Sequence, residues 1–180
     1  MLALILQHPN HMCFRRQARE RAVQFLFQID MNPEEDLVSA LEHFWLHQRP
    51  EVIELLEGKS SWGEHKELPP PTAGDLTIQH FAEPLVRGVI ENQDSIDREL
   101  SSLATNWDLH RMAGVDRNIL RLAVYEMLHR NDIPPVVSIN EAVDIAKKFS
   151  TDDSGKFVNG ILDKMKSRLD RPARTATEAR

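Results

Sequence analysis

The chain has 180 residues, of which 41% are hydrophobic and 28% are charged, and its formal net charge is −6. These values fit one domain of ordinary globular composition and exclude wholesale disorder. The only cysteine, Cys13, excludes an internal disulfide framework and a multi-cysteine metal site, and fits a reducing, intracellular setting.

The charge is unevenly distributed along the chain. Residues 1–24 hold 4 bases and 1 acid, residues 25–110 hold 5 bases and 17 acids, and residues 111–180 hold 13 bases and 10 acids. Basic ends around an acidic middle indicate two different contact surfaces. The negative sum therefore does not exclude a nucleic-acid partner.

We expect no targeting signal at the N-terminus. The apolar run Leu2–Leu6 is too short for a signal-peptide core and has neither a basic start nor a small-residue cleavage site. No stretch approaches the roughly 20 apolar residues of a membrane span. We expect residues 1–13 to be a flexible extension, with Met12 as an alternative start, and the protein to be cytoplasmic.

Helical periodicity is strong and strand signals are weak along the whole chain. A first helix is predicted over about residues 14–30. Its apolar stripe falls at i, i+4, i+7, i+8 and i+11: Ala18, Ala22, Phe25, Leu26 and Ile29. Residues 32–35 predict the start of a second helix that reaches to about residue 48, because Pro33 suits a first turn and the acids after it favour the positive end of the dipole.

Residues 50–74 interrupt this pattern with glycine, serine and three consecutive prolines. We expect a short helix near residues 51–57 and then an exposed, partly extended loop, which together form an insertion. Helical patterns resume at Asp75, although Pro84 is expected to kink or delay that helix. The next helix is expected to start at Asp94 or Ser95.

The C-terminal half predicts three more helices. Residues 119–128 are apolar on nearly every side, which predicts a central, buried helix. Ser138 and Glu141 match a capping box before the next stripe, and Ser150–Ser154 precedes the last one. The total is an all-α fold of about seven helices, followed by a flexible polar tail over residues 170–180.

No motif for catalysis is found in the sequence, and we expect neither an enzyme nor a cofactor. His43 and His47 lie at i, i+4, but a metal needs a third ligand, so surface histidines are the favoured interpretation. Ser154 lacks a local base pattern. Asp152 and Asp153 are more typical of helix capping than of paired catalytic carboxylates.

Two segments favour RNA binding. Arg15, Arg16 and Arg19 gather guanidiniums at a helix start, where the dipole disfavours cations and a polyanion would relieve their repulsion. The alternative is a solvated basic turn. In the second segment the helix start and Lys156 suit a phosphate, and Phe157 could stack on an unpaired base. The alternative for Phe157 is core packing at helical spacing.

Four motifs together resemble the NusB family of transcription antitermination factors. They are Arg15-Arg-Gln-Ala-Arg19, Val115-Asp-Arg-Asn-Ile-Leu-Arg-Leu-Ala-Val-Tyr-Glu126, Ile139-Asn-Glu-Ala-Val143 and Lys156-Phe-Val-Asn-Gly-Ile-Leu-Asp163. The resemblance covers about residues 14–50 and 76–169. It implies one helical RNA-binding domain over residues 14–169, built as two small perpendicular bundles. The same module heads certain ribosomal RNA cytosine methyltransferases, whose catalytic domain would not fit in 180 residues.

The resemblance implies a function and its partners. The protein would bind boxA RNA together with ribosomal protein S-ten (NusE), and would join NusA, NusG and RNA polymerase during ribosomal RNA transcription. The residues implied to lie near RNA are Arg15, Arg16, Arg19, Asp153, Lys156 and Phe157. Phe27, which stands where tyrosine is common, and Asp116 would face the NusE-like partner, and the acidic middle suits a basic ribosomal protein. The alternative is a helical protein–protein scaffold without RNA binding, and a homodimer stays open.

Overall fold

The computed structural model describes residues 10–32, 36–49, 52, 68–104, 108–151 and 153–176, without the side chains of residues 10–13. Within these ranges the chain forms seven α-helices, one 3-10 helix and no strand. They are α1 (Asn10–Met31), α2 (Leu37–His47), α4 (Ala73–Glu91), α5 (Gln93–Leu103), η2 (Leu109–Arg111), α6 (Gly114–His129), α7 (Pro135–Phe149) and α8 (Ser154–Lys166). The predicted all-α fold is confirmed.

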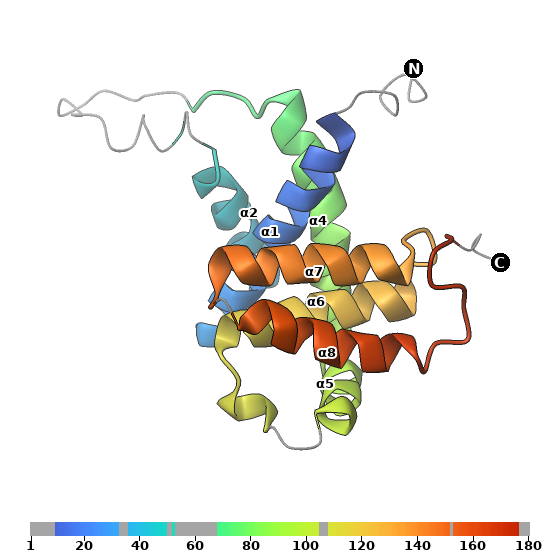
Figure 1. Ribbon diagram of the computed structural model, residues 1–180. Coiled ribbons are helices and arrows are strands. Elements are labelled where there is room, and N and C mark those ends of the chain that lie inside the picture. The colour runs from blue at the N-terminus through green and yellow to red at the C-terminus, as the bar shows by residue number, and fades with distance from the viewer. Residues whose placement is uncertain are drawn as a thin grey trace.

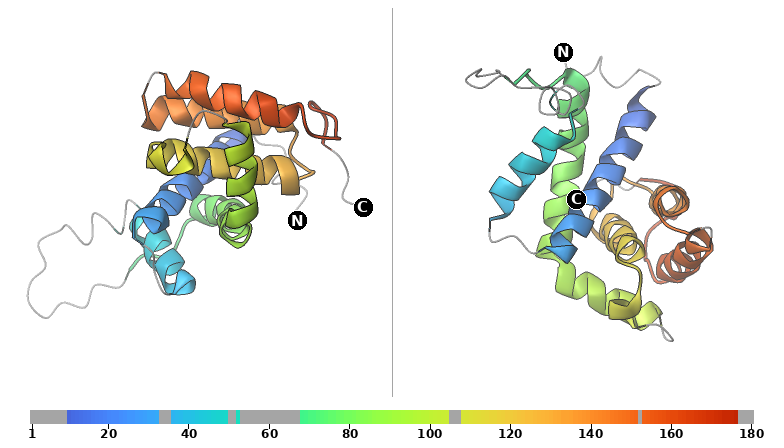
Figure 2. Two further views of the ribbon diagram at one scale, coloured as in Figure 1. Left: turned by 90° about the horizontal axis from the view of Figure 1, so that it is seen from below. Right: turned by 90° about the vertical axis from the view of Figure 1, so that its left-hand side faces the viewer.

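The helices form two small bundles that cross each other. Helices α1, α2 and α4 make the first bundle, and α5 to α8 make the second (Figure 1). The right-hand view of Figure 2 looks nearly along α6, α7 and α8, whereas α1 and α4 lie close to the plane of the page. Because α1 packs on both α4 and α6, it joins the two bundles. The predicted perpendicular arrangement is confirmed.

A single hydrophobic core extends through both bundles. In the first bundle, Phe44 packs edge to face against Phe25 and Trp45, with ring centres 5.1 and 5.2 Å away. In the second, α6 is buried on nearly every side, as predicted. Where α4 crosses α6, a Cβ atom on Gly88 would overlap the Tyr125 ring, so glycine lets these two helices approach closely.

Several helices begin at other residues than predicted. Helix α1 begins at Asn10. The predicted start of α2 at residues 32–35 was wrong, because Asp36 is the N-cap and accepts hydrogen bonds from the backbone N–H groups of Val38 and Ser39. Helix α4 begins after Thr72 with a capping box and continues through Pro84. The predicted short helix near residues 51–57 lies outside the described residues, apart from residue 52, as does most of the insertion.

The predicted capping box of Ser138 and Glu141 was also wrong. Pro135 occupies the first turn of α7, where proline is pre-organised, so Ser138 lies inside the helix with its side chain buried. Helix α5 begins at Gln93 rather than at Asp94 or Ser95. Asn92 ends α4 and starts α5, which leaves no loop between them.

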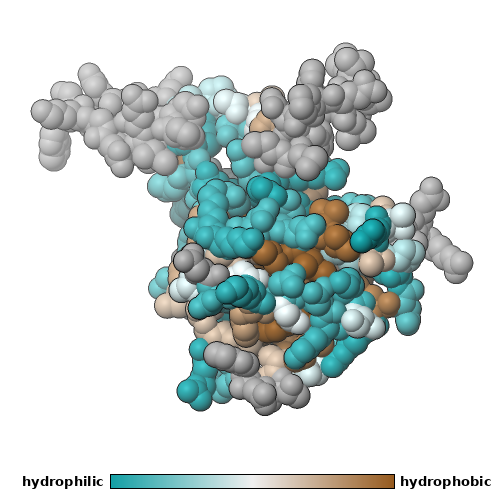
Figure 3. All heavy atoms as spheres, in the orientation of Figure 1, coloured by the Kyte–Doolittle hydropathy of each residue, from teal (hydrophilic) through white to brown (hydrophobic). Residues whose placement is uncertain are grey.

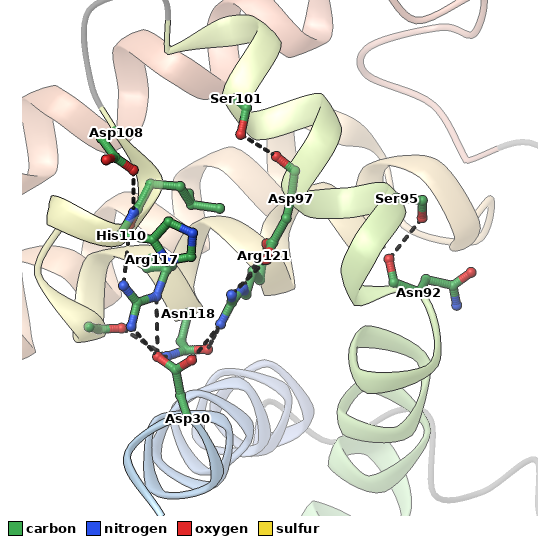
Figure 4. Close-up of polar contacts among 12 residues, drawn as sticks. Asp30, Asn92, Ser95, Asp97, Ser101, Asp108, His110, Arg117, Asn118 and Arg121 are labelled. Atoms are coloured by element: carbon green, nitrogen blue, oxygen red, sulfur yellow. Dashed lines mark hydrogen bonds and ion pairs between the residues drawn. The ribbon is translucent and has the colours of Figure 1, made fainter. Parts of the chain in front are cut away.

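A polar network fastens the end of α1 to α5 and α6 (Figure 4). We call it the Asp30 network, and it consists of Asp30, Asp97, Arg117, Asn118 and Arg121. Arg121 donates from Nη1 to Asp30 at 2.9 Å and from Nε and Nη2 to Asp97 at 2.8 and 2.7 Å. Burial works against a charged Asp30, but hydrogen bonds from Arg117 and Arg121 outweigh it and lower the pKa of this carboxyl.

Part of the expected tail, residues 170–176, is described and bonds to the second bundle. Arg171 donates to the backbone carbonyls of Arg130, Ile133 and Glu126 at 3.1, 3.2 and 3.4 Å. The N–H of Val136 donates to the carbonyl of Ala173 at 3.1 Å. These bonds fasten residues 171–173 to the C-terminal end of α6 and to the start of α7.

Candidate nucleic-acid interface

Ion pairs line the contact between α1 and α7. We call this the α1–α7 seam, formed by Arg16, Glu20, Glu141, Asp144 and Lys148. Arg16 donates to Glu141 from Nε and Nη2 at 3.1 and 2.9 Å, and to Asp144 from Nη2 at 2.8 Å. One helical turn further along α7, Lys148 Nζ lies 2.7 Å from Glu20. The Arg16 and Asp144 side chains are 44% and 46% exposed, so their charges remain accessible from solvent.

Positive charge continues from the seam onto α8. The side chain of Lys147 lies against Gly155, where an added Cβ would come within 3.0 Å of Lys147 Cγ. The next residue, Lys156, is 86% exposed, with Nζ 3.5 Å from Asp153. We call five exposed cations, on the N-terminal part of α1, the C-terminal part of α7 and the start of α8, the cationic surface: Arg15, Arg16, Lys147, Lys148 and Lys156. Hydrophilic side chains cover much of the α7 and α8 face in Figure 3, with a band of apolar residues between them.

An aromatic ring supports the start of this surface. The guanidinium carbon of Arg15 lies 5.5 Å from the ring centre of Phe81 on α4, and those of Arg19 and Arg130 lie at 5.2 and 5.5 Å. Cation–π contacts of this kind favour a fixed guanidinium position. Phe81 thus orients Arg15 while leaving it exposed.

Arg19 differs from its neighbours in the arginine motif. Its side chain is 5% exposed, and Nε donates to Glu126, itself 1% exposed, at 2.8 Å. Ser138 Oγ donates to the other oxygen of Glu126 at 2.7 Å. A guanidinium enclosed in this way does not reach a phosphate without breaking a buried ion pair, so direct RNA contact by Arg19 is corrected to a structural role.

A hydrogen bond to α6 anchors the start of α8. Asp153 is the N-cap by position, but its side chain makes no capping bond and is exposed, so capping by Asp153 was wrong; Asp152 lies outside the described residues. Ser154 Oγ donates to Asp116 at 2.9 Å. Phe157 is half-buried, and the buried part of its ring packs against the core. Stacking of the exposed part on a base stays a prediction.

Phe27 and Asp116 lie together at the start of α6. The ring of Phe27 is half-buried, and an added Cβ on Gly114 would come within 2.9 Å of it. Asp116 is 8% exposed, and its Oδ1 atom is buried with no hydrogen-bond partner among the described residues. Both side chains thus lie near the first turn of α6, where Asp116 anchors α8 through Ser154.

The sequence interpretation missed Lys147, Lys148 and Asp144. Two adjacent lysines in the last turn of a helix, directly before a Ser-Thr-Asp-Asp loop, were an available signal. His47 Nδ1 lies 2.7 Å from the carbonyl oxygen of His43, and the described side chains contain no cluster of three or more metal-binding residues. Among the described residues, none of the helices is long and apolar enough to cross a membrane.

Comparisons with known proteins agree with this architecture. The sequence model of the NusB family matches residues 16–167. Transcription antitermination protein NusB of Anaeromyxobacter dehalogenans is 42% identical over 160 residues, 89% of this chain and 94% of that protein. NusB of Bacillus velezensis is 41% identical over 158 residues, 87% of this chain and 98% of that protein.

Solved structures lead to the same family. T. maritima NusB superposes with a TM-score of 0.65 at 35% identity, covering 86% of this chain and 91% of that one. A crystal structure of the antitermination factors NusB and NusE in complex with double-stranded RNA has a TM-score of 0.62 at 25% identity, covering 88% and 99%. Fold, motifs and similarity along most of the sequence agree, and the chain belongs to the NusB family.

Proposed function

We propose that this protein is a transcription antitermination factor that binds boxA-type RNA together with ribosomal protein NusE and supports ribosomal RNA transcription by RNA polymerase. The observation that carries the proposal is the cationic surface, to which three helices contribute exposed side chains. The names of the relatives and the solved NusB–NusE–RNA complex support it. The role is regulatory and non-catalytic.

On the RNA side, the exposed cations would contact phosphates. Arg15 and Arg16 present planar guanidiniums, which suit bidentate phosphate contacts, and Lys156 adds a flexible charge. Asp153 is exposed beside it and could accept hydrogen bonds from a base edge. Phe157 would stack a base with the exposed part of its ring. Arg19 would act indirectly, by holding α1 against α6 through Glu126.

On the protein side, Phe27 and Asp116 mark the surface that we assign to NusE. This site lies at the start of α6, away from the Arg16 end of α1. The acidic segment 25–110 would favour a basic ribosomal protein by charge complementarity. We place the pair in a larger cytoplasmic complex with NusA, NusG and RNA polymerase.

The test is RNA binding by wild type and by Arg16→Glu, each titrated with and without NusE over a series of salt concentrations. Losing one charged contact of about 1.5–3 kcal/mol should weaken binding roughly 10- to 100-fold. Wild-type affinity should fall as salt rises. The matched control is Arg168→Glu, the same charge change at a side chain that is 50% exposed and pairs with Glu99 instead.

Three outcomes are informative. Weakened RNA binding by Arg16→Glu alone supports the proposal, provided that helicity by circular dichroism is unchanged. Equal weakening by Arg168→Glu would remove the assignment of the cationic surface. A NusE complex that forms while no RNA binds at any salt would favour the protein–protein scaffold.

A further inference from the structure

We propose that Asp144 competes with RNA phosphate for Arg16 and thereby weakens the binding of RNA to the cationic surface. This inference rests on the proposed RNA-binding function. It assigns to Asp144 a role that opposes binding, although this residue lies within the cationic surface.

The two carboxylates that hold Arg16 are not equivalent. Glu141 accepts two hydrogen bonds, from Nε and Nη2, and is 13% exposed. Its Oε2 atom also lies 4.0 Å from Nη1 of Arg19, and Arg19 in turn pairs with the buried Glu126. Glu141 is therefore fixed by its surroundings, and it sets the direction in which Arg16 points.

Asp144 is the exchangeable partner. It accepts one hydrogen bond, from Nη2 of Arg16, and both side chains are nearly half exposed. Pairs of this kind contribute little to stability because water screens them, so a phosphate can replace the carboxylate. Among the described residues, Nη1 of Arg16 has no hydrogen bond and offers two further donors.

A phosphate at Arg16 therefore meets a negative charge beside it. It either displaces Asp144 from Nη2 or occupies Nη1 next to the carboxylate, and each route lowers the affinity. Glu20 holds Lys148 in the same manner one turn along the seam. RNA contacts at these two cations are thus exchanges of one anion for another, and they yield less binding free energy than contacts at unpaired cations.

The experiment uses Asp144→Asn, which keeps the size of the side chain and an acceptor for Arg16 but removes the charge. In full-length protein without NusE, this variant should bind boxA-type RNA about three- to fivefold more tightly, the range for one surface charge contact. The slope of log affinity against log salt should become steeper by up to about one, because the contact of Arg16 with a phosphate then displaces a condensed cation from the RNA without leaving a free carboxylate behind.

Two controls make the result specific. Asp163→Asn removes the same charge from a side chain that is also 46% exposed and pairs with Lys166 on α8. It should change affinity by less than Asp144→Asn does. In an Arg16→Gln background the gain from Asp144→Asn should disappear, because a competitor needs the group for which it competes.

The inference is overturned if Asp144→Asn binds RNA no more tightly than Asp163→Asn, or if its gain persists without Arg16. Either result, with wild-type RNA binding intact, leaves the proposed function standing. If wild type binds no RNA with or without NusE, the proposed function fails and this inference with it.

Discussion

Two ion-pair clusters at opposite ends of α1 contrast with each other. The Asp30 network at the C-terminal end is largely enclosed, and Arg121, which links Asp30 to Asp97, is 6% exposed. The α1–α7 seam near the N-terminal end also pairs an arginine with two carboxylates, yet Arg16 and Asp144 remain almost half exposed. Access to water therefore distinguishes the two clusters. The enclosed cluster fastens helices together, whereas the charges of the exposed cluster can exchange partners.

The largest expected effect of breaking this contrast is at Arg121. Arg121→Met leaves Asp30 and Asp97 without their shared cation and should lower the free energy of unfolding by about 3 kcal/mol. Urea unfolding followed by circular dichroism measures this. Arg168→Met, at an exposed pair, should stay within about 0.5 kcal/mol of wild type. A similar loss in both variants would contradict the distinction between buried and exposed clusters.

A smaller effect is expected at Phe157, whose exposure is intermediate between the buried and the exposed cluster. The ring is half-buried against the core, so Phe157→Ala should lower the free energy of unfolding by about 1–2 kcal/mol, less than the about 3–5 kcal/mol of a fully buried phenylalanine. RNA affinity measured on the still-folded variant then tests stacking. Unchanged affinity would show that the ring serves packing alone.

The smallest effect concerns acid stability. The pKa of Asp30 is lower in the folded protein than the ordinary value of about 3.9, so its stabilising contribution is complete above that value and is lost as pH falls through the folded pKa. In Arg121→Met the pKa should rise toward the ordinary value. The midpoint of acid unfolding should therefore shift to higher pH than in wild type, and a shift to lower pH would contradict the role of Arg121.

Much of the fold could be predicted because helical periodicity is local. The stripes of α1, α6, α7 and α8 and the buried nature of α6 followed from spacing alone. The burial of Arg19 did not follow from spacing. Arg15 lies seven residues before Ala22, on the same face as the buried stripe, and is nevertheless exposed.

Other features depend on contacts between distant residues. Glu141 and Asp144 are 125 and 128 positions from Arg16, and nothing in their local sequence shows that they meet it. The start of α7 was misjudged for a different reason, since a Ser-x-x-Glu pattern was given more weight than the proline that precedes it. The sequence thus named segments of the candidate RNA surface, which stays a prediction, but it did not indicate the acidic residues that lie beside them.

Asn92 has a mechanical consequence. As the single residue between α4 and α5, it is anchored on both sides: its Nδ2 donates to the carbonyl of Gly88 at 2.8 Å, and its own carbonyl accepts from Ser95 Oγ at 2.8 Å. A junction bonded in this way allows little rotation of α4 relative to α5. The two bundles should therefore keep a constant angle to each other. Because the cationic surface and the Phe27 site each combine side chains of both bundles, that constant angle also fixes the geometry within each surface.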